Sequence, residues 1–229
     1  MNKLLKAFLL FSGILLAIYC VGKFTGTLVM FKVRSTASYP TLKEGQYFWA
    51  SNLIRAKRFD LVCYNAVQPP YGRGIFVSRI CGMEGDWVEI KNGTLYINKR
   101  NADHNLPLAL PYHIPYADYL SLQESKEIEH REPWEYEEIT EDTIATYVDV
   151  RRLRNRLIHW QRVILPREQM NDEINMKFQK KWNQDHFGPI QVPPEHCFVL
   201  GDNRLYAMDS RYTGFIHKKD IVAVAIGNN

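Results

Sequence analysis

The pattern of apolar and polar positions divides the chain into an apolar N-terminus, two β-rich regions and a more polar middle. Residues 4–21 are mostly apolar and carry Lys6 as their only charge, with Lys3 before them and Lys23 after them. This stretch is about long enough to cross the hydrocarbon core of a bilayer when the Lys6 stem carries its amine outward. The pattern predicts a transmembrane helix, here given the bounds 4–22.

A cleaved signal peptide and a lipoprotein signal have the same pattern, so both are weighed here against a membrane anchor. A signal-peptide cleavage site requires small residues, but Ala17 is followed by Ile18 and the large Tyr19. The same bulky pair precedes Cys20, where a lipoprotein has small residues. A buried helix of a soluble domain is the remaining alternative. We predict an uncleaved single-pass anchor, and the early lysines favour a cytoplasmic N-terminus with the main domain outside the cytoplasm.

Short runs of β-branched and aromatic residues, separated by turn residues, follow the anchor and predict strands. They span residues 27–33, 47–50, 60–64, 75–77, 87–90, 95–98, 196–200 and 221–226. Asn92-Gly93 predicts a hairpin turn, because this pair adopts the positive φ angles of a two-residue loop. Since no helices alternate with these strands, the pattern predicts a mainly β fold built on an antiparallel sheet.

The composition changes between residues 101 and 186. Prolines punctuate residues 106–117, residues 138–149 are acidic, and five arginines fall within residues 151–162. We interpret this segment as a charged, partly helical α/β insertion, and we expect its charge runs to be solvated surface. The predicted units are an anchor at 1–22, a β-rich core at 23–100 and 187–229, and an inserted subdomain at 101–186.

The composition itself is that of a globular chain. Of the 229 residues, 46% are apolar and 24% charged, which excludes wholesale disorder. A net charge of +4 is too small and too scattered to indicate nucleic acid as a partner. Cys63 and Cys81 lie in neighbouring predicted strands, so a disulfide and two small buried thiols both remain open. The histidines lack the spacing of a zinc site, and no metal or cofactor is expected.

Four short motifs rich in turn-forming residues lie between the predicted strands. They are Ser35–Leu42, Lys57–Val62, Val77–Asp86 and Gly201–Phe215. In this order, behind an N-terminal anchor, they resemble the type I signal peptidase (leader peptidase) family, whose blocks run S-M-x-P-T-L, R-G-D-[IV]-V, Y-I-K-R-V-x-G-x-P-G-D and G-D-N-R-x-N-S-x-D-S-R-x-x-G. The resemblance covers residues 30–100 and 187–226. It implies a partly open, barrel-like fold and a location at the bacterial plasma membrane. It also implies a protein that processes the signal peptides of exported preproteins.

The resemblance also implies a serine protease that works without histidine. A serine hydroxyl attacks the scissile carbonyl, and a lysine amine kept neutral by burial accepts its proton. The nucleophile is implied three residues before Pro40, where this chain has Ala37, and the general base immediately before Arg79, where it has Ser78. A supporting hydroxyl of the last motif is replaced by Ala207. Both halves of the catalytic dyad are therefore missing.

Ser38 is the candidate for a displaced nucleophile. On a strand, a shift of one residue turns a side chain to the opposite face, so we expect Ser38 to point away from the side that Ala37 faces. Arg79 cannot act as the base, because a guanidinium stays protonated. The nearest other candidates for a base are Lys57, Lys91 and His196.

The framework of the family is retained. The resemblance implies a groove for an extended peptide, walled by the strands around Arg34–Ser38 and Ile75–Ser78. The groove residues are Ser35, Ser38, Tyr39, Pro40, Ile75, Val77 and Ser78, with Tyr39 placed where it would plug the groove. The structural support beneath them is expected from Asp202, Asn203, Arg204, Asp209, Ser210 and Arg211.

These observations lead to two hypotheses. The first is a catalytically degenerate signal peptidase homologue that binds signal peptides, preproteins, an active signal peptidase or the export machinery. The second is an active signal peptidase I, a serine endopeptidase that uses Ser38. A partner subunit that supplies the missing residues is a third alternative, which no residue favours. A buried amine or imidazole within hydrogen-bond reach of Ser38 Oγ would favour the enzyme.

Overall fold

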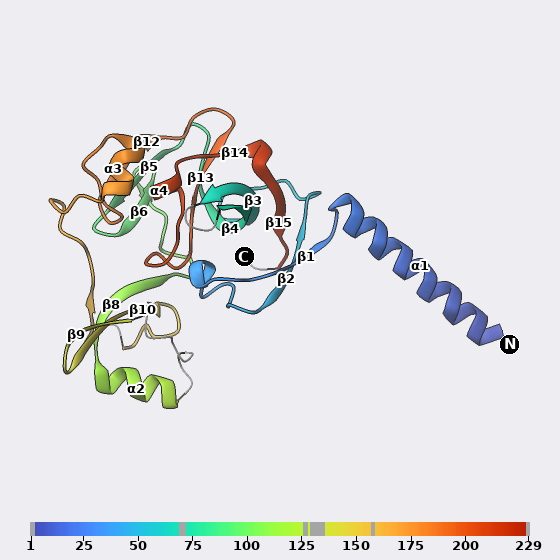
Figure 1. Cartoon of the computed structure of the whole chain (residues 1–229), viewed down its shortest axis with the longest axis horizontal. Coiled ribbons are helices and arrows are strands. Elements are labelled where there is room, and N and C mark those ends of the chain that lie inside the picture. Colours follow the sequence, from blue (N-terminus) through green and yellow to red (C-terminus); the bar gives the residue numbers. More distant parts are fainter. Residues whose placement is uncertain (1–2, 69–71, 126–127, 129–135, 157–158, 228–229) are drawn as a thin grey trace.

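The apolar N-terminus forms one long helix that projects from the rest of the molecule (Figure 1). The computed structural model describes residues 3–68, 72–125, 128, 136–156 and 159–227. Helix α1 (Lys3–Thr25) has 23 residues, so at about 1.5 Å per residue it is long enough to cross a bilayer core of about 30 Å. None of its residues is buried, which contradicts the alternative of a buried helix in a soluble domain.

The main sheet joins the two ends of the chain. Its seven antiparallel strands have the order β1-β2-β15-β3-β4-β13-β14. They are β1 (Val29–Lys32), β2 (Tyr47–Ser51), β3 (Leu61–Gln68), β4 (Gly72–Met83), β13 (His196–Leu200), β14 (Ile216–His217) and β15 (Ile221–Ala225). The antiparallel β fold predicted from the sequence is confirmed, and β15 lies between two strands from the first third of the chain.

A second antiparallel sheet, of order β12-β5-β6-β7, packs on the first. Its strands are β5 (Trp87–Lys91), β6 (Thr94–Ile97), β7 (Arg100–Asn101) and β12 (Phe187–Gln191). The predicted turn at Asn92-Gly93 is confirmed, with both residues at positive φ. Helix α3 (Asp172–Phe178) inserts Ile174 into the core shared by the two sheets, and the short helix α4 (Ser210–Thr213) follows the last motif.

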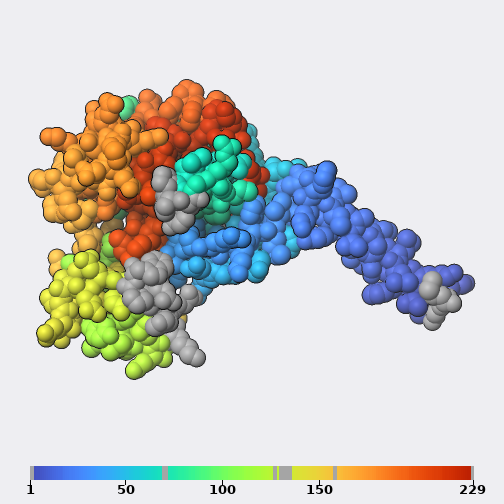
Figure 2. Space-filling model, viewed as in Figure 1, coloured from blue at the N-terminus to red at the C-terminus, as the bar shows by residue number. Residues whose placement is uncertain are grey.

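The inserted segment forms a third sheet, of order β11-β8-β10-β9, with one helix against it. Its elements are β8 (Ala109–Pro115), α2 (Tyr116–Glu124), β9 (Tyr136–Thr140), β10 (Thr143–Asp149) and β11 (Gln161–Arg162). It has its own apolar core, formed between residues 106 and 160. Figure 2 shows it as a green and yellow lobe beside the rest of the domain.

The prediction that residues 138–149 are solvated surface is wrong for β10. Ile144, Tyr147 and Val148 are buried, whereas Glu137 and Glu138 of β9 are exposed. Side chains of a strand alternate between its two faces, so a segment with many acidic residues still presents an apolar face to a core. A count of charges along the chain does not detect this alternation.

The insertion is tied to the last motif through its first strand. The Ala109 amide donates to the Asp202 carbonyl (2.9 Å), and the Arg204 amide donates to the Ala109 carbonyl (3.0 Å). Tyr147 of β10 packs between Tyr39 and Tyr206, with ring centroids 5.5 and 5.4 Å apart. The inserted lobe therefore contacts the first and last motifs directly.

The four cysteines are free thiols. Cys63 and Cys81 are both buried, in different apolar clusters. Burial raises the pKa of each of these two thiols to about 12. They serve here as small apolar core residues and form no disulfide.

The insertion core provides a test of this packing. Leu122 of α2 is fully buried, whereas Leu120 on the same helix is exposed. We expect Leu122→Ala to lower the free energy of unfolding by about 2–5 kcal/mol, because it leaves a cavity. Leu120→Ala should change it by less than about 1 kcal/mol. Urea unfolding of the full chain in detergent, followed by tryptophan fluorescence, measures both, and equal effects of the two variants would contradict the assigned packing.

Candidate functional site

The segment that carries Ala37 is a single helical turn. Thr36–Ser38 form a 3₁₀ turn, η1, closed by a hydrogen bond from the Tyr39 amide to the Thr36 carbonyl (3.0 Å). The predicted strand around Arg34–Ser38 is therefore wrong, and β1 already ends at Lys32. Neighbouring side chains on a 3₁₀ turn are about 120° apart, so Ser38 does not simply oppose Ala37 as it would on a strand.

Ser38 is buried, and its hydroxyl is used for structure. Its Oγ donates to the main-chain carbonyl of Val77 in β4 at 3.2 Å. No amine or imidazole accepts its proton among the interactions of the described residues. A hydroxyl that donates to a carbonyl has no general base to activate it.

Ser78 lies in a buried network of neutral groups. Its Oγ is 3.3 Å from the Tyr64 hydroxyl, which also accepts from Gln68 Nε2 at 3.2 Å. Burial raises the pKa of Tyr64 to about 12, against the smaller lowering effect of its hydrogen bonds with Ser78 and Gln68. The phenol therefore stays protonated at neutral pH, and the position implied for a lysine holds no base.

Ala37 packs directly against the last motif. The Asn203 amide donates to the Ala37 carbonyl at 3.1 Å. A Cβ added to Gly201 would lie 2.6 Å from that carbonyl oxygen and 2.2 Å from the Ala207 Cβ, so only glycine fits here. Ala207 stands where the resemblance implies a supporting hydroxyl. In space, Gly201 lies between Ala207 and the Ala37 carbonyl.

One buried ion pair connects all four motifs. Arg79 Nε and Nη2 each donate to an Asp202 carboxylate oxygen at 2.7 Å. Thr41 of the first motif donates to the same carboxylate, and Arg79 Nη1 donates to the Phe59 carbonyl of the second motif at 2.6 Å. Burial alone lowers the pKa of Arg79, but Asp202 outweighs burial and holds it above its ordinary value.

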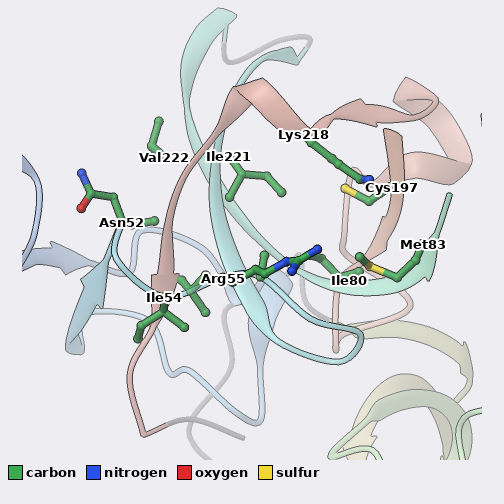
Figure 3. Close-up of a pocket in the computed structure, with 12 residues that line it drawn as sticks. Asn52, Ile54, Arg55, Ile80, Met83, Cys197, Lys218, Ile221 and Val222 are labelled. Carbon is green, nitrogen blue, oxygen red and sulfur yellow. The ribbon is translucent and has the colours of Figure 1, made fainter. Parts of the chain in front are cut away.

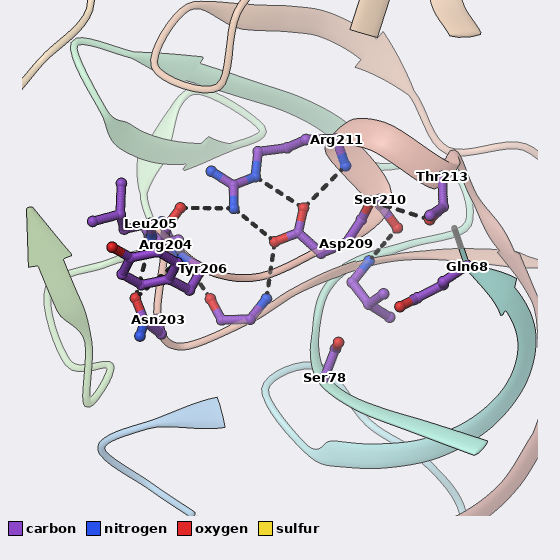
Figure 4. Close-up of polar contacts among 12 residues, drawn as sticks. Gln68, Ser78, Asn203, Arg204, Leu205, Tyr206, Asp209, Ser210, Arg211 and Thr213 are labelled. Atoms are coloured by element: carbon purple, nitrogen blue, oxygen red, sulfur yellow. Dashed lines mark hydrogen bonds and ion pairs between the residues drawn. The ribbon is translucent and has the colours of Figure 1, made fainter. Parts of the chain in front are cut away.

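A second buried pair holds the loop of the last motif (Figure 4). Arg211 Nε and Nη2 bind the two Asp209 oxygens at 2.9 Å each, and Asp209 also accepts from the Gly201 amide at 3.0 Å. Ser210 Oγ accepts from the Val199 amide at 2.9 Å. Arg204, bound to Asp103 at 2.7 Å, donates from its side chain to the Gly201 carbonyl. The residues expected to give support thus form one buried set.

The segment of β4 next to Ser78 has an open edge. Strand β13 pairs with β4 only from Arg79 to Met83, so the other edge of residues 72–78 has no partner strand in the described part of the chain. Successive residues of a strand direct their main-chain groups to opposite edges. The Val77 carbonyl faces this edge and accepts from Ser38 of η1, so the main-chain groups of Ile75 and the Val77 amide face the part of the edge that no described strand covers.

The predicted groove residues divide into two groups. Ser35 and Ile75 are exposed and Val77 is half-buried, close to the open edge of β4. Tyr39 is buried among Tyr147, Tyr206 and Ala109, so its ring packs on the insertion and does not plug the edge. Pro40 is half-buried beside it.

Sequence reasoning missed Tyr64 and Gln68. The predicted strand stopped at residue 64, whereas β3 continues to Gln68. Residues 64 and 68 share a face because the side-chain period of a strand is two. A predicted strand that extended to residue 68 would therefore have placed Gln68 beside Tyr64. The partner of Ser78 depends on the pairing of β3 with β4.

Comparison with known proteins agrees with the motifs. The family model described as "Signal peptidase, peptidase S26" matches residues 2–227. "Signal peptidase IB" of Staphylococcus aureus is 27% identical over 90% of this chain and 78% of its own, and "Signal peptidase I" of Streptococcus pneumoniae serotype 4 is 26% identical over 85% and 78%. A signal peptidase I crystal structure from Enterococcus faecalis V583 superposes with a TM-score of 0.35 at 22% identity, covering 75% of this chain and 97% of the other.

The Arg79–Asp202 pair leads to a stability prediction. Arg79→Met leaves the buried Asp202 carboxylate without its cation, and we expect a loss of about 3–5 kcal/mol in unfolding free energy. Lys91→Met removes a cation from the exposed Lys91–Glu89 pair (2.8 Å) and should cost less than about 1 kcal/mol. Denaturant unfolding of both variants measures the difference. A small effect of Arg79→Met would show that the pair does not hold the motifs together.

Proposed function

Because this chain belongs to the signal peptidase family, peptidase S26, we propose that it binds signal peptides of exported proteins without cleaving them. The observation that carries the proposal is the state of the reaction centre. Ala37 stands at the implied nucleophile position, and Ser78 is hydrogen-bonded to Tyr64 where a lysine is implied. The buried ion pairs Arg79–Asp202 and Arg211–Asp209 are present around it.

The buried contacts support the absence of catalysis. Ser38 has neither an accessible hydroxyl nor a base, since its Oγ donates to a carbonyl. The Tyr64 phenol, with its pKa raised by burial to about 12, does not accept a proton at neutral pH. Loss of a nucleophile or its base costs several powers of ten in rate. The combined loss supports a binding protein rather than a slow enzyme.

The open edge of β4 supports the binding of an extended peptide. An added strand would pair with the main-chain groups of Ile75 and with the Val77 amide, as in other cases of strand addition, because the Val77 carbonyl already accepts from Ser38 Oγ. The exposed side chains of Ser35 and Ile75 would line it. Main-chain pairing suits signal peptides, because it tolerates many sequences.

Helix α1 supports a location at the membrane. We propose that it anchors the chain in the bacterial plasma membrane, with the N-terminus cytoplasmic and the β domain outside. In that position the open edge would meet preproteins as they emerge. An active signal peptidase or the export machinery is the further partner that this placement allows.

A cleavage assay tests the proposal. We expect the purified full chain to leave a signal-peptide substrate intact, with a rate at least about 10⁴-fold below that of a control signal peptidase I such as the Staphylococcus aureus relative. Mass spectrometry of the products over a long incubation measures the rate. Clear cleavage that disappears in Ser38→Ala would establish the alternative of an active signal peptidase I with a displaced nucleophile.

Peptide binding at the β4 edge is tested by Ile75→Pro. Proline removes the amide hydrogen that faces the open edge and leaves the pairing with β3 intact, so the variant should fold. We expect it to weaken signal-peptide binding about tenfold or more in fluorescence anisotropy. Ile75→Ala, which keeps the amide, should bind at least threefold more tightly than Ile75→Pro. Equal affinities for the two variants would show that the peptide does not pair with this edge.

A further inference from the structure

A cavity of about 260 Å³ is lined in part by Asn52, which contacts the C-terminal end of α1, and by none of residues 72–78 (Figure 3). Its floor is apolar and belongs to the core of the main sheet. The floor residues are Ile80, Met83, Cys197, Ile221 and Val224. Its rim carries the polar side chains of Asn52, Arg55 and Lys218. The cavity thus combines an apolar interior with polar and charged groups at its entrance.

The rim residue Asn52 is hydrogen-bonded to the C-terminal end of α1. Asn52 Nδ2 donates to the Thr25 carbonyl at 2.9 Å, and the Asn52 amide donates to the Gly26 carbonyl at 3.3 Å. The next two residues, Leu53 and Ile54, are apolar and exposed, at 76% and 40% of their surface. When α1 spans a bilayer, these contacts bring the cavity entrance to the membrane surface.

The charges at the entrance favour an anion. Lys218 Nζ is paired with Glu84 at 2.6 Å, whereas exposed Arg55 has no ion pair within the part of the chain that the structure describes. Figure 3 shows the Arg55 and Lys218 side chains on the same side of the view, and both line the cavity. Glu84 and Glu195 both lie near Lys218, so Arg55 is the cation at this entrance that is left for an anion.

We propose that this cavity binds the headgroup of an anionic phospholipid, with the phosphate on Arg55 and the adjoining glycerol and methylenes on Ile54, Ile221 and Val222. A planar guanidinium binds phosphate oxygens in pairs. Pockets for drug-sized ligands measure about 300–1,000 Å³, so this cavity is suited to the headgroup while the acyl chains remain in the bilayer. The inference rests on the membrane location in the proposed function, but not on peptide binding.

The apolar surfaces favour a lipid over free phosphate. Inorganic phosphate gains nothing from the apolar floor and would need more hydrogen-bond donors than Arg55 supplies. Exposed Leu53 and Ile54 gain from contact with acyl chains at the same entrance. A lipid headgroup satisfies both the charge and the apolar surface.

Lipid binding to the full chain tests the proposal. The chain is purified in a neutral detergent and titrated with phosphatidylglycerol or phosphatidylcholine, and native mass spectrometry counts the bound lipid. We expect phosphatidylglycerol to bind about fivefold or more tightly than phosphatidylcholine. Arg55→Gln should lose about fivefold, the effect of one basic residue at an anionic surface. Lys181→Gln, an equal charge change on a distant exposed lysine, should match the original chain.

Three results would overturn the proposal. They are equal binding of the two lipids, an equal loss in Lys181→Gln, and displacement of the bound lipid by millimolar inorganic phosphate. Flotation of the full chain with liposomes separates this inference from the proposed function. A chain that does not float refutes both the membrane location and the lipid site. A chain that floats and binds signal peptide without lipid preference refutes the lipid site alone.

Discussion

The ion pair between Arg79 and Asp202 is the constraint on which the rest of the site depends. Both groups are buried, so each must have its hydrogen bonds completed by protein. Asp202 receives Arg79 and Thr41, and Arg79 also reaches the Phe59 carbonyl, which brings segments from four distant parts of the sequence to one point. A displaced segment would leave a charge unpaired in the interior, and this penalty fixes the positions of all four motifs.

This arrangement separates the residues that hold the motifs together from those at the predicted dyad positions. Ala37, Ser78 and Ala207 take no part in either buried ion pair, so their side chains can differ without exposing a buried charge. Each of these side chains is small. Ser78 is hydrogen-bonded to Tyr64, which in turn accepts a hydrogen bond from Gln68.

The inserted lobe and helix α1 contact different parts of the β domain. The lobe contacts the last motif through Ala109 and the Tyr39–Tyr147–Tyr206 cluster, so a change in its position would reach the loop that backs Ala37. The anchor contacts the loop after β2 through Asn52. The later residues of β4 pair with β13 inside the main sheet, whereas its earlier residues form the open edge. A peptide bound at this edge would therefore rest on a rigid support.

The sequence by itself determined the apolar helix, most strands of the two core sheets, the Asn92-Gly93 turn and the order of the motifs, because these depend on local periodicity and turn chemistry. It also led to the prediction that Ala37 and Ser78 stand at the dyad positions of the family, since that prediction requires only the spacing from Pro40 and Arg79. Only the tertiary structure decided that Ser38 donates to Val77, that Tyr64 and Gln68 are the partners of Ser78, and that residues 138–149 include a buried strand face. These facts depend on which strands lie side by side. The pattern of residues along the chain does not show which distant segments become neighbours in space.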